Sequence, residues 1–193
     1  MIETNWVVET ESPADRPITL ADIKRHSVIE HDDDDYLLLS MLDAAVDYAQ
    51  QYMNRQIIDA EFTAFYSCFD PMMELPVYEA SSITEIKYYD TDNAEQTLDS
   101  SVYELVRTLS AQAVGLAYNQ VFPDTYPRED AVSVRFRAGY ASRNAVPATI
   151  KIGLLMLVRQ YDEYREGTKL NSVSEVPAGV SAHFDHYRHY VAG

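Results

Sequence analysis

Three groups of side chains in the sequence are of the types that bind metal ions. Four aspartates stand in a row at 32–35, a second acidic group spans 90–95, and histidines recur at His183, His186 and His189. A calcium loop needs alternating oxygen ligands, a glycine at the bend and a distal glutamate, and neither acidic group has that glycine. We therefore interpret 32–35 as a solvated helix start, 90–95 as a polar hairpin turn, and the histidines as a surface tail.

The sequence also contains no pattern that predicts a catalytic nucleophile. Cys68 is the only cysteine, has no cationic neighbour in its aromatic segment, and is interpreted as a buried structural residue. The Gly-x-Ser-x-Gly elbow of hydrolases and the glycine-rich loops that hold phosphate groups are both absent. We therefore expect no enzyme, no cofactor and no metal site.

Composition and charge exclude further classes of protein. The chain has 193 residues, of which 47% are hydrophobic, so it has enough apolar side chains for a core and is not a disordered chain. We expect neither a membrane span, since the longest apolar stretch is about half of the ~20 residues required, nor a secretory leader. The net charge of −16 disfavours a protein that reads nucleic-acid sequence. The 15 tyrosines favour contacts between proteins.

Apolar periodicity predicts three helices. Thr19 and Asp22 form a variant of the capping-box pattern at the start of a helix over 20–27. Apolar residues at spacings of three and four predict a long helix over 33–55 and another, with a proline at its first turn, over 147–166. The last of these is apolar on more than one face, which is typical of a helix that is buried or lies at a subunit interface.

Between these helices the pattern changes to a period of two, which is typical of strands. The predicted strands are separated by turn dipeptides and lie at 61–69, 83–89, 102–107, 113–118 and 132–136. We therefore expect an α+β fold. Its mainly helical core would consist of a short N-terminal helix and two long packed helices, with an inserted small antiparallel β subdomain and a short C-terminal tail.

The expected domain organisation follows from these elements. It comprises one structural unit overall, with a polar lead-in (1–16), an N-terminal helical part (17–58), the inserted β subdomain (59–140), a C-terminal helix (141–167) that packs on 33–55, and a linker and tail (168–193).

Motifs that occur in a fixed order run through about four-fifths of the chain. They are PITLADIK at 17–24 with the helix end YMNRQII at 52–58; LP at 75–76, SITEIKYYD at 82–90 and QTLD…Y at 96–103; VSVRFRAGY at 132–140 with VPATIK at 146–151; and VPAGV…YR at 176–188. This ordered set resembles the head–tail connector family of tailed bacteriophages. The segments 1–16 and 108–128 depart from the family pattern.

The resemblance implies a structural virion protein, an adaptor, and no enzyme. Its expected partners are other copies of itself in a cyclic ring of about twelve subunits, the portal protein, and a downstream stopper or tail protein. Double-stranded DNA would pass through the ring without sequence-specific binding, and an acidic channel would suit that passage. The expected location is the virion neck, and the host cytoplasm during assembly. The alternatives are another neck component, such as a stopper or tail-completion protein, and a monomeric ligand-binding module.

Candidate interface residues come from the strongly apolar helix and from the C-terminal tail, which in the family reaches toward the portal. These candidates for contact with other subunits or the portal are Ile152, Leu155, Met156, Tyr161, Tyr164, Phe184, Tyr187, Arg188 and Tyr190.

Overall fold

The computed structural model describes residues 6–13, 15–108, 112–164 and 178–189, in which all strands but the first follow one another between two pairs of helices. The elements are β1 (Trp6–Glu11), α1 (Leu20–Ser27), α2 (Asp35–Met53), β2 (Ala60–Tyr66), β3 (Met72–Glu74), β4 (Ala80–Tyr89), β5 (Glu95–Thr97), β6 (Tyr103–Arg107), β7 (Gln112–Leu116), β8 (Val132–Ala138), the 3₁₀ turn η1 (Arg143–Ala145), α3 (Ala148–Glu163) and α4 (Ala178–Asp185).

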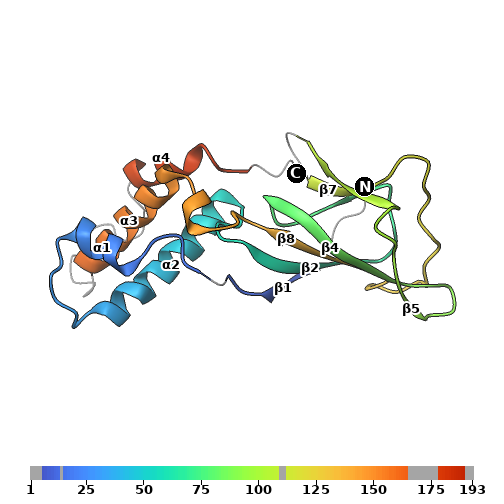
Figure 1. The fold of residues 1–193 in the computed structure, drawn as a ribbon, viewed down its shortest axis with the longest axis horizontal. Coiled ribbons are helices and arrows are strands. Elements are labelled where there is room, and N and C mark those ends of the chain that lie inside the picture. The colour runs from blue at the N-terminus through green and yellow to red at the C-terminus, as the bar shows by residue number, and fades with distance from the viewer. Residues whose placement is uncertain (1–5, 14, 109–111, 165–177, 190–193) are drawn as a thin grey trace. The chain divides into compact units, whose positions relative to one another are not determined.

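Contacts group the chain into two compact units (Figure 1). The sheet unit comprises Met1–Ala14, Asp59–Gly139 and Tyr190–Gly193, and the helical unit comprises Asp15–Ile58 and Tyr140–His189. Each unit is built around a hydrophobic core of its own, and the two cores share no residue.

The expectation of a mainly helical core is wrong. The described residues form four α-helices and eight strands, and the strands make two antiparallel sheets. The sheet unit has its own buried core, which includes Phe62, Tyr66 and Phe136, instead of relying on the helices for burial. Six of its buried positions are alanines, whose small side chains give a weak apolar signal in the sequence: Ala60, Ala64, Ala80, Ala113, Ala131 and Ala138.

The helical unit begins with the capping box predicted for α1. The Thr19 hydroxyl accepts a hydrogen bond from the backbone N–H of Asp22 at 3.0 Å, and Asp22 accepts one from the backbone N–H of Thr19, also at 3.0 Å. These bonds satisfy two N–H groups that a helix start leaves free. They also hold the pKa of Asp22 below its ordinary value, since Thr19 hydrogen-bonds to the charged carboxylate.

The two long helices, α2 and α3, also form close to the predicted ranges, and they pack on one another. α2 ends at Asn54, which adopts a left-handed conformation with φ 52°, and the backbone N–H of Asn54 caps the carbonyls of Gln50 and Gln51. α3 starts immediately after Pro147, and its buried side is formed by Ile150, Leu154, Leu157 and Val158.

The sheet unit contains a five-stranded sheet in the order β1-β2-β8-β4-β5 and a three-stranded sheet in the order β3-β7-β6 (Figure 1). Alternation sets the register of the central pair, because the buried residues of β2 lie opposite those of β8, as in Phe62 opposite Phe136 and Ala64 opposite Val134. The intervening residues, including Arg135 and Arg137, form the outer face.

Ion pairs connect the strands across that outer face. Arg137 contacts Asp59 at 2.8 Å and Glu11 at 3.4 Å, while Lys87 contacts Glu95 at 3.1 Å. Opposite charges on neighbouring strands stabilise a sheet modestly when they are exposed. The outer face is therefore polar over its centre.

The short strands β3 and β5 lie outside the predicted strands, and two further elements form in the segments expected to be a polar lead-in and a tail. β1 forms within the expected polar lead-in by pairing with β2, and α4 forms within the expected tail. Neither has a clear local pattern, and both depend on contacts with residues distant in the sequence. Among the helices of the described residues, none has both the length and the apolar character that crossing a membrane requires.

Candidate assembly interface

The outward side of α3 carries exposed apolar side chains. Ile152 is 46% exposed, while Leu155 and Met156 are half-buried against the core of the helical unit. These three residues and Lys151 occupy neighbouring positions on the helix surface, opposite the buried side. We call these four residues the α3 face. A large apolar side chain exposed in this way is available to a partner protein.

The other candidate residues have different surroundings. Tyr161 is half-buried, and its burial raises the pKa of the phenol, while Tyr164 at the end of α3 is 43% exposed. Tyr187 is half-buried against the core, and Arg188 is exposed with its guanidinium 4.8 Å from the centre of the Tyr52 ring. Tyr190 lies outside the described residues.

Phe184, also a candidate, is fully buried within the helical unit. Its ring lies directly over Gly153 of α3, where a Cβ atom would come within 2.7 Å of the ring. The glycine therefore creates a notch that the ring fills. The sequence could not reveal this notch, because the glycine and the ring that fills it belong to different helices.

Polar contacts also fix α4 and the residues after it. The Tyr52 hydroxyl donates a hydrogen bond to the Asp185 carboxylate at 2.5 Å, and the backbone N–H of His189 donates one to the carbonyl of Met53 at 2.8 Å. The bond to Asp185 is the main cause of a raised Tyr52 pKa. Residues 178–189 thus dock on the helical unit by both apolar and polar contacts.

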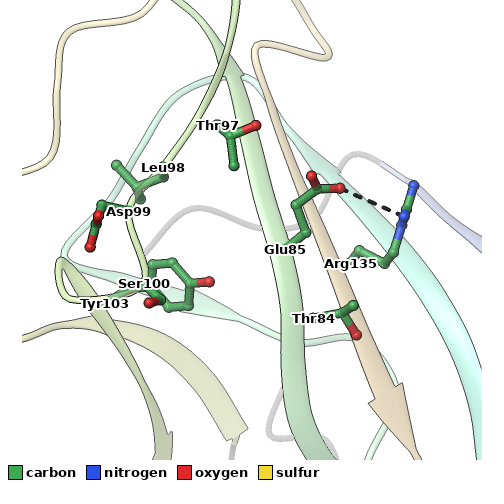
Figure 2. Close-up of a pocket in the computed structure, with 8 residues that line it drawn as sticks. All are labelled: Thr84, Glu85, Thr97, Leu98, Asp99, Ser100, Tyr103 and Arg135. Atoms are coloured by element: carbon green, nitrogen blue, oxygen red, sulfur yellow. Dashed lines mark ion pairs between the residues drawn. The ribbon is translucent and has the colours of Figure 1, made fainter.

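A cavity of about 550 Å³ opens in the sheet unit beside β4 (Figure 2). Its lining includes the carboxylates of Glu85 and Asp99, the ring of Tyr103 and the guanidinium of Arg135, which lies 3.6 Å from Glu85. Burial, and then the negative charges of Glu85 and Asp99, raise the pKa of Tyr103. Hydrogen bonds from Ser101 lower the pKa of Asp99.

This cavity brings charged and hydroxyl side chains together. Its hydroxyl side chains, such as Thr84 and Ser100, have no histidine among the lining residues to activate them. Nor do the described residues hold three or more His, Cys, Asp or Glu side chains placed to bind a metal ion. The arrangement suits polar recognition.

The acidic run at 32–35 is the helix start that the sequence predicted. Lys24 donates a hydrogen bond to Asp32 at 2.5 Å and forms an ion pair with Asp35, and the bond to Asp32 is the main cause of a raised Lys24 pKa. Asp34 is the N-cap residue, although its side chain makes no capping bond. The aspartates are therefore partly neutralised by one lysine.

The acidic group at 90–95 is the predicted hairpin turn between β4 and β5. Asp90 accepts hydrogen bonds from the backbone N–H groups of Asp92 and Ala94, each at 3.0 Å, and from the Gln96 side chain at 2.8 Å. These bonds, first that from Ala94, lower the pKa of Asp90. The carboxylate therefore stabilises the turn.

Sequence reasoning missed one exposed apolar segment, which is β1. Trp6, Val7 and Val8 are 42%, 39% and 50% exposed, and every residue of this edge strand is exposed. Three large apolar residues in succession were a visible signal. They lacked the alternation by which the other strands were found.

Comparison with known families now gives the class of the protein. Residues 17–114 match the model of the phage gp6-like head-tail connector protein family. The matched range is about half of the chain and includes the helices α1 and α2 and the strands from β2 to β6. The chain belongs to this family. A search of curated proteins finds no match.

Solved structures of phage-like particles contain the same fold. A chain in the neck of an empty gene transfer agent (GTA) particle with C6 symmetry matches with a TM-score of 0.79 and 21% identity over 97% of both chains. Chains in the native GTA virion and in the native GTA neck with C12 symmetry match with TM-scores of 0.78 and 0.76, each at 20% identity and over 97% of both chains. Together with the family, these similarities identify a structural connector protein of the neck of a phage-like particle.

Proposed function

We propose that copies of this chain form a cyclic ring in the neck, as an adaptor between the portal protein and the next stopper or tail component. The family match over 17–114 is the observation that carries this proposal. The C6 and C12 symmetry of the particle necks that contain this fold supports a ring. The protein would act by assembly, without catalysis, after its synthesis in the host cytoplasm.

Exposed apolar side chains give the chain surfaces for such assembly. In the helical unit, Ile152 and Tyr164 are exposed, and the α3 face continues through Leu155 and Met156. Each subunit of a cyclic ring uses two unlike surfaces, so that one surface of a copy meets the other surface of its neighbour. The α3 face, Tyr161, Tyr164, Tyr187 and Arg188 are the residues we assign to contacts with neighbours or the portal.

The acidic surface suits DNA passage through such a ring. The chain carries 31 acidic and 15 basic residues, and phosphate groups are repelled by net negative charge. DNA would then slide through the channel without the phosphate contacts that produce tight, salt-dependent binding.

The test is native mass spectrometry of the purified protein over a range of concentrations, with electron microscopy of any large species. We expect closed rings of one subunit number, formed either by the protein alone or after mixing with the portal protein of the same particle. Adding the tail component separately distinguishes an adaptor, which binds the portal, from a tail-completion protein. A protein that stays monomeric and binds neither component would contradict the proposal.

A further inference from the structure

β1 has the features of a strand that is covered in an assembly. Among the described residues, it lies at the edge of the five-stranded sheet and pairs with β2 on one side only. All six of its residues are exposed, including Trp6, Val7 and Val8. Edge strands of soluble proteins are normally protected by charge, proline or a bulge, and here the apolar half has none of these devices. The bulge and the acidic residues belong to the other half, after Val8.

β1 thus divides into an apolar half and an acidic half. Trp6 stacks on Phe65 with ring centres 4.8 Å apart, so this end of the strand is held in place while staying exposed. Among the acidic residues, Glu11 contacts Arg137 at 3.4 Å. Glu9 is exposed, and its carboxylate has no hydrogen bond or ion pair among the described residues. Glu9 is therefore available to a cation from another molecule.

The α3 face has the complementary composition. Its apolar part is Ile152 with Leu155 and Met156, and its charged part is Lys151. Within the described residues, the Lys151 ammonium forms no hydrogen bond or ion pair. The distance along β1 from Trp6 to Glu9 is about 10 Å, and that along α3 from Met156 to Lys151 is about 8 Å. Trp6 and Val8 lie opposite Phe65 and Thr63 on one face of the sheet, whereas Glu9 lies opposite Phe62 on the other face. A partner must therefore lie along the free edge of β1, where it reaches side chains of both faces.

Charge differs in the same sense between the sheet unit and the C-terminal part of the helical unit. Residues 1–14 and 59–139, which belong to the sheet unit, carry 17 acidic and 5 basic residues, whereas 140–189 carries 5 acidic and 6 basic residues. Complementary charge favours contact between the sheet unit of one molecule and the 140–189 region of another. Contacts between like surfaces would instead bring β1 against β1, with carboxylates on both strands.

We propose that β1 of one copy docks on the α3 face of the next copy, with Trp6 and Val8 against Ile152 and with Glu9 paired to Lys151. The inference rests on the proposed function, since it requires copies that assemble. Because the two surfaces are different, the contact is head-to-tail, and its repetition closes a ring when the rotation between copies allows. The occupant of the α3 face is thus a second copy of this chain.

Disulfide trapping between two molecules tests the contact even where association is weak. In a Cys68→Ser background, one protein carries Val8→Cys and the other carries Ile152→Cys. The matched control replaces Val8→Cys by Tyr118→Cys, at a residue of the sheet unit that is 97% exposed. We expect the pair at 8 and 152 to cross-link about tenfold faster than the control pair. Equal rates would overturn the inference.

A charge exchange tests the ion pair. Glu9→Lys and Lys151→Glu should each weaken association by about three- to tenfold, since each creates a pair of like charges, and the double variant should restore it. Glu104→Lys, at an exposed residue of β6, is the control for the same charge change and should have no effect. Trp6 is the only tryptophan, so a blue shift of its fluorescence reports the covering of β1.

Mixing distinguishes a head-to-tail contact from a symmetric one. A Trp6→Ser/Val8→Ser variant and an Ile152→Ser variant should each fail to form rings, while their mixture should form one-to-one pairs, because one intact β1 can still meet one intact α3 face. Rings that persist in both variants would overturn this inference and leave the proposed function standing. Absence of any assembly by the wild-type chain, with or without the portal, would overturn the proposed function itself.

Discussion

Gly153 gives a quantitative test of how α4 is held on the helical unit. The Phe184 ring is fully buried, and a Cβ atom on residue 153 would lie 2.7 Å from its Cε1 and Cζ atoms and 3.2 Å from Cβ of His183. Carbon atoms that are not bonded approach to about 3.5 Å at their optimal separation. The substitution Gly153→Ala therefore requires Phe184, and with it α4, to move.

Two opposing effects set the change in the free energy of unfolding caused by Gly153→Ala. Alanine is more favourable than glycine inside a helix by about 1 kcal/mol, whereas one extra carbon in a filled core costs about 1–3 kcal/mol. We expect Gly153→Ala to destabilise the wild-type chain by up to about 2 kcal/mol. In a Phe184→Ala background the notch is empty, so the same substitution should stabilise by about 1 kcal/mol. We therefore predict that the effect of Gly153→Ala on the free energy of unfolding has opposite signs in the two backgrounds.

The assay is urea unfolding of the four proteins of this cycle, together with hydrogen exchange of the backbone amides of α4. Gly153→Ala should accelerate exchange in α4 more than in α2. Gly179→Ala is the matched control, because no atom of the described residues outside its own helix turn lies within 4 Å of the position of its Cβ, and it should stabilise. Stabilisation by Gly153→Ala in both backgrounds would refute the reasoning.

Three further substitutions probe the local structure by urea unfolding. Val28→Gly should stabilise by about 0.5–1 kcal/mol, because Val28 is 82% exposed and is a β-branched residue with φ 57°. Asp22→Asn should destabilise at pH 6 but less toward pH 2, because Thr19 lowers the Asp22 pKa and the stabilisation disappears as pH falls below about 4 through that lowered value. Gln112→Leu should cost about 1–3 kcal/mol by leaving the buried N–H of Ala80 without its acceptor.

Each of these three substitutions has a control measurement. Val121→Gly removes a valine that is equally exposed but has a negative φ, so it should not stabilise, and equal effects at 28 and 121 would exclude relief of strain. Gln112→Glu keeps an acceptor for Ala80 and should cost less than the leucine. An Asp22→Asn effect that stays constant from pH 6 to pH 2 would show that the carboxylate charge is not involved.

Elements whose signals are local could be predicted from the sequence. Thr19 and Asp22 lie within four residues of one another and specify the start of α1, and the predicted capping-box hydrogen bonds form. The strand β8 was found from the alternation of Val132, Val134 and Phe136, because one face of that strand is buried. In these cases the physical cause of the structure lies inside the segment itself.

The elements that were missed depend on partners far away in the sequence. β1 has no buried face, so its position is set by pairing with β2, more than 50 residues later. The helix α4 is positioned by the fit of Phe184 to Gly153, which no periodicity encodes. The same reason explains why Phe184 was predicted as an interface residue although its ring is buried by its own chain.

The separate cores of the two units decide how the tests of assembly can be interpreted. β1 lies on the sheet unit and the α3 face on the helical unit, and the hydrophobic cores of these units share no residue. Effects of substitutions at sites without shared partners add in the free energy of unfolding. Glu9→Lys and Lys151→Glu should therefore be additive in stability measured on dilute monomer. Suppose that the double variant recovers association while the two effects on the free energy of unfolding stay additive. The two residues then interact between copies and not within one chain.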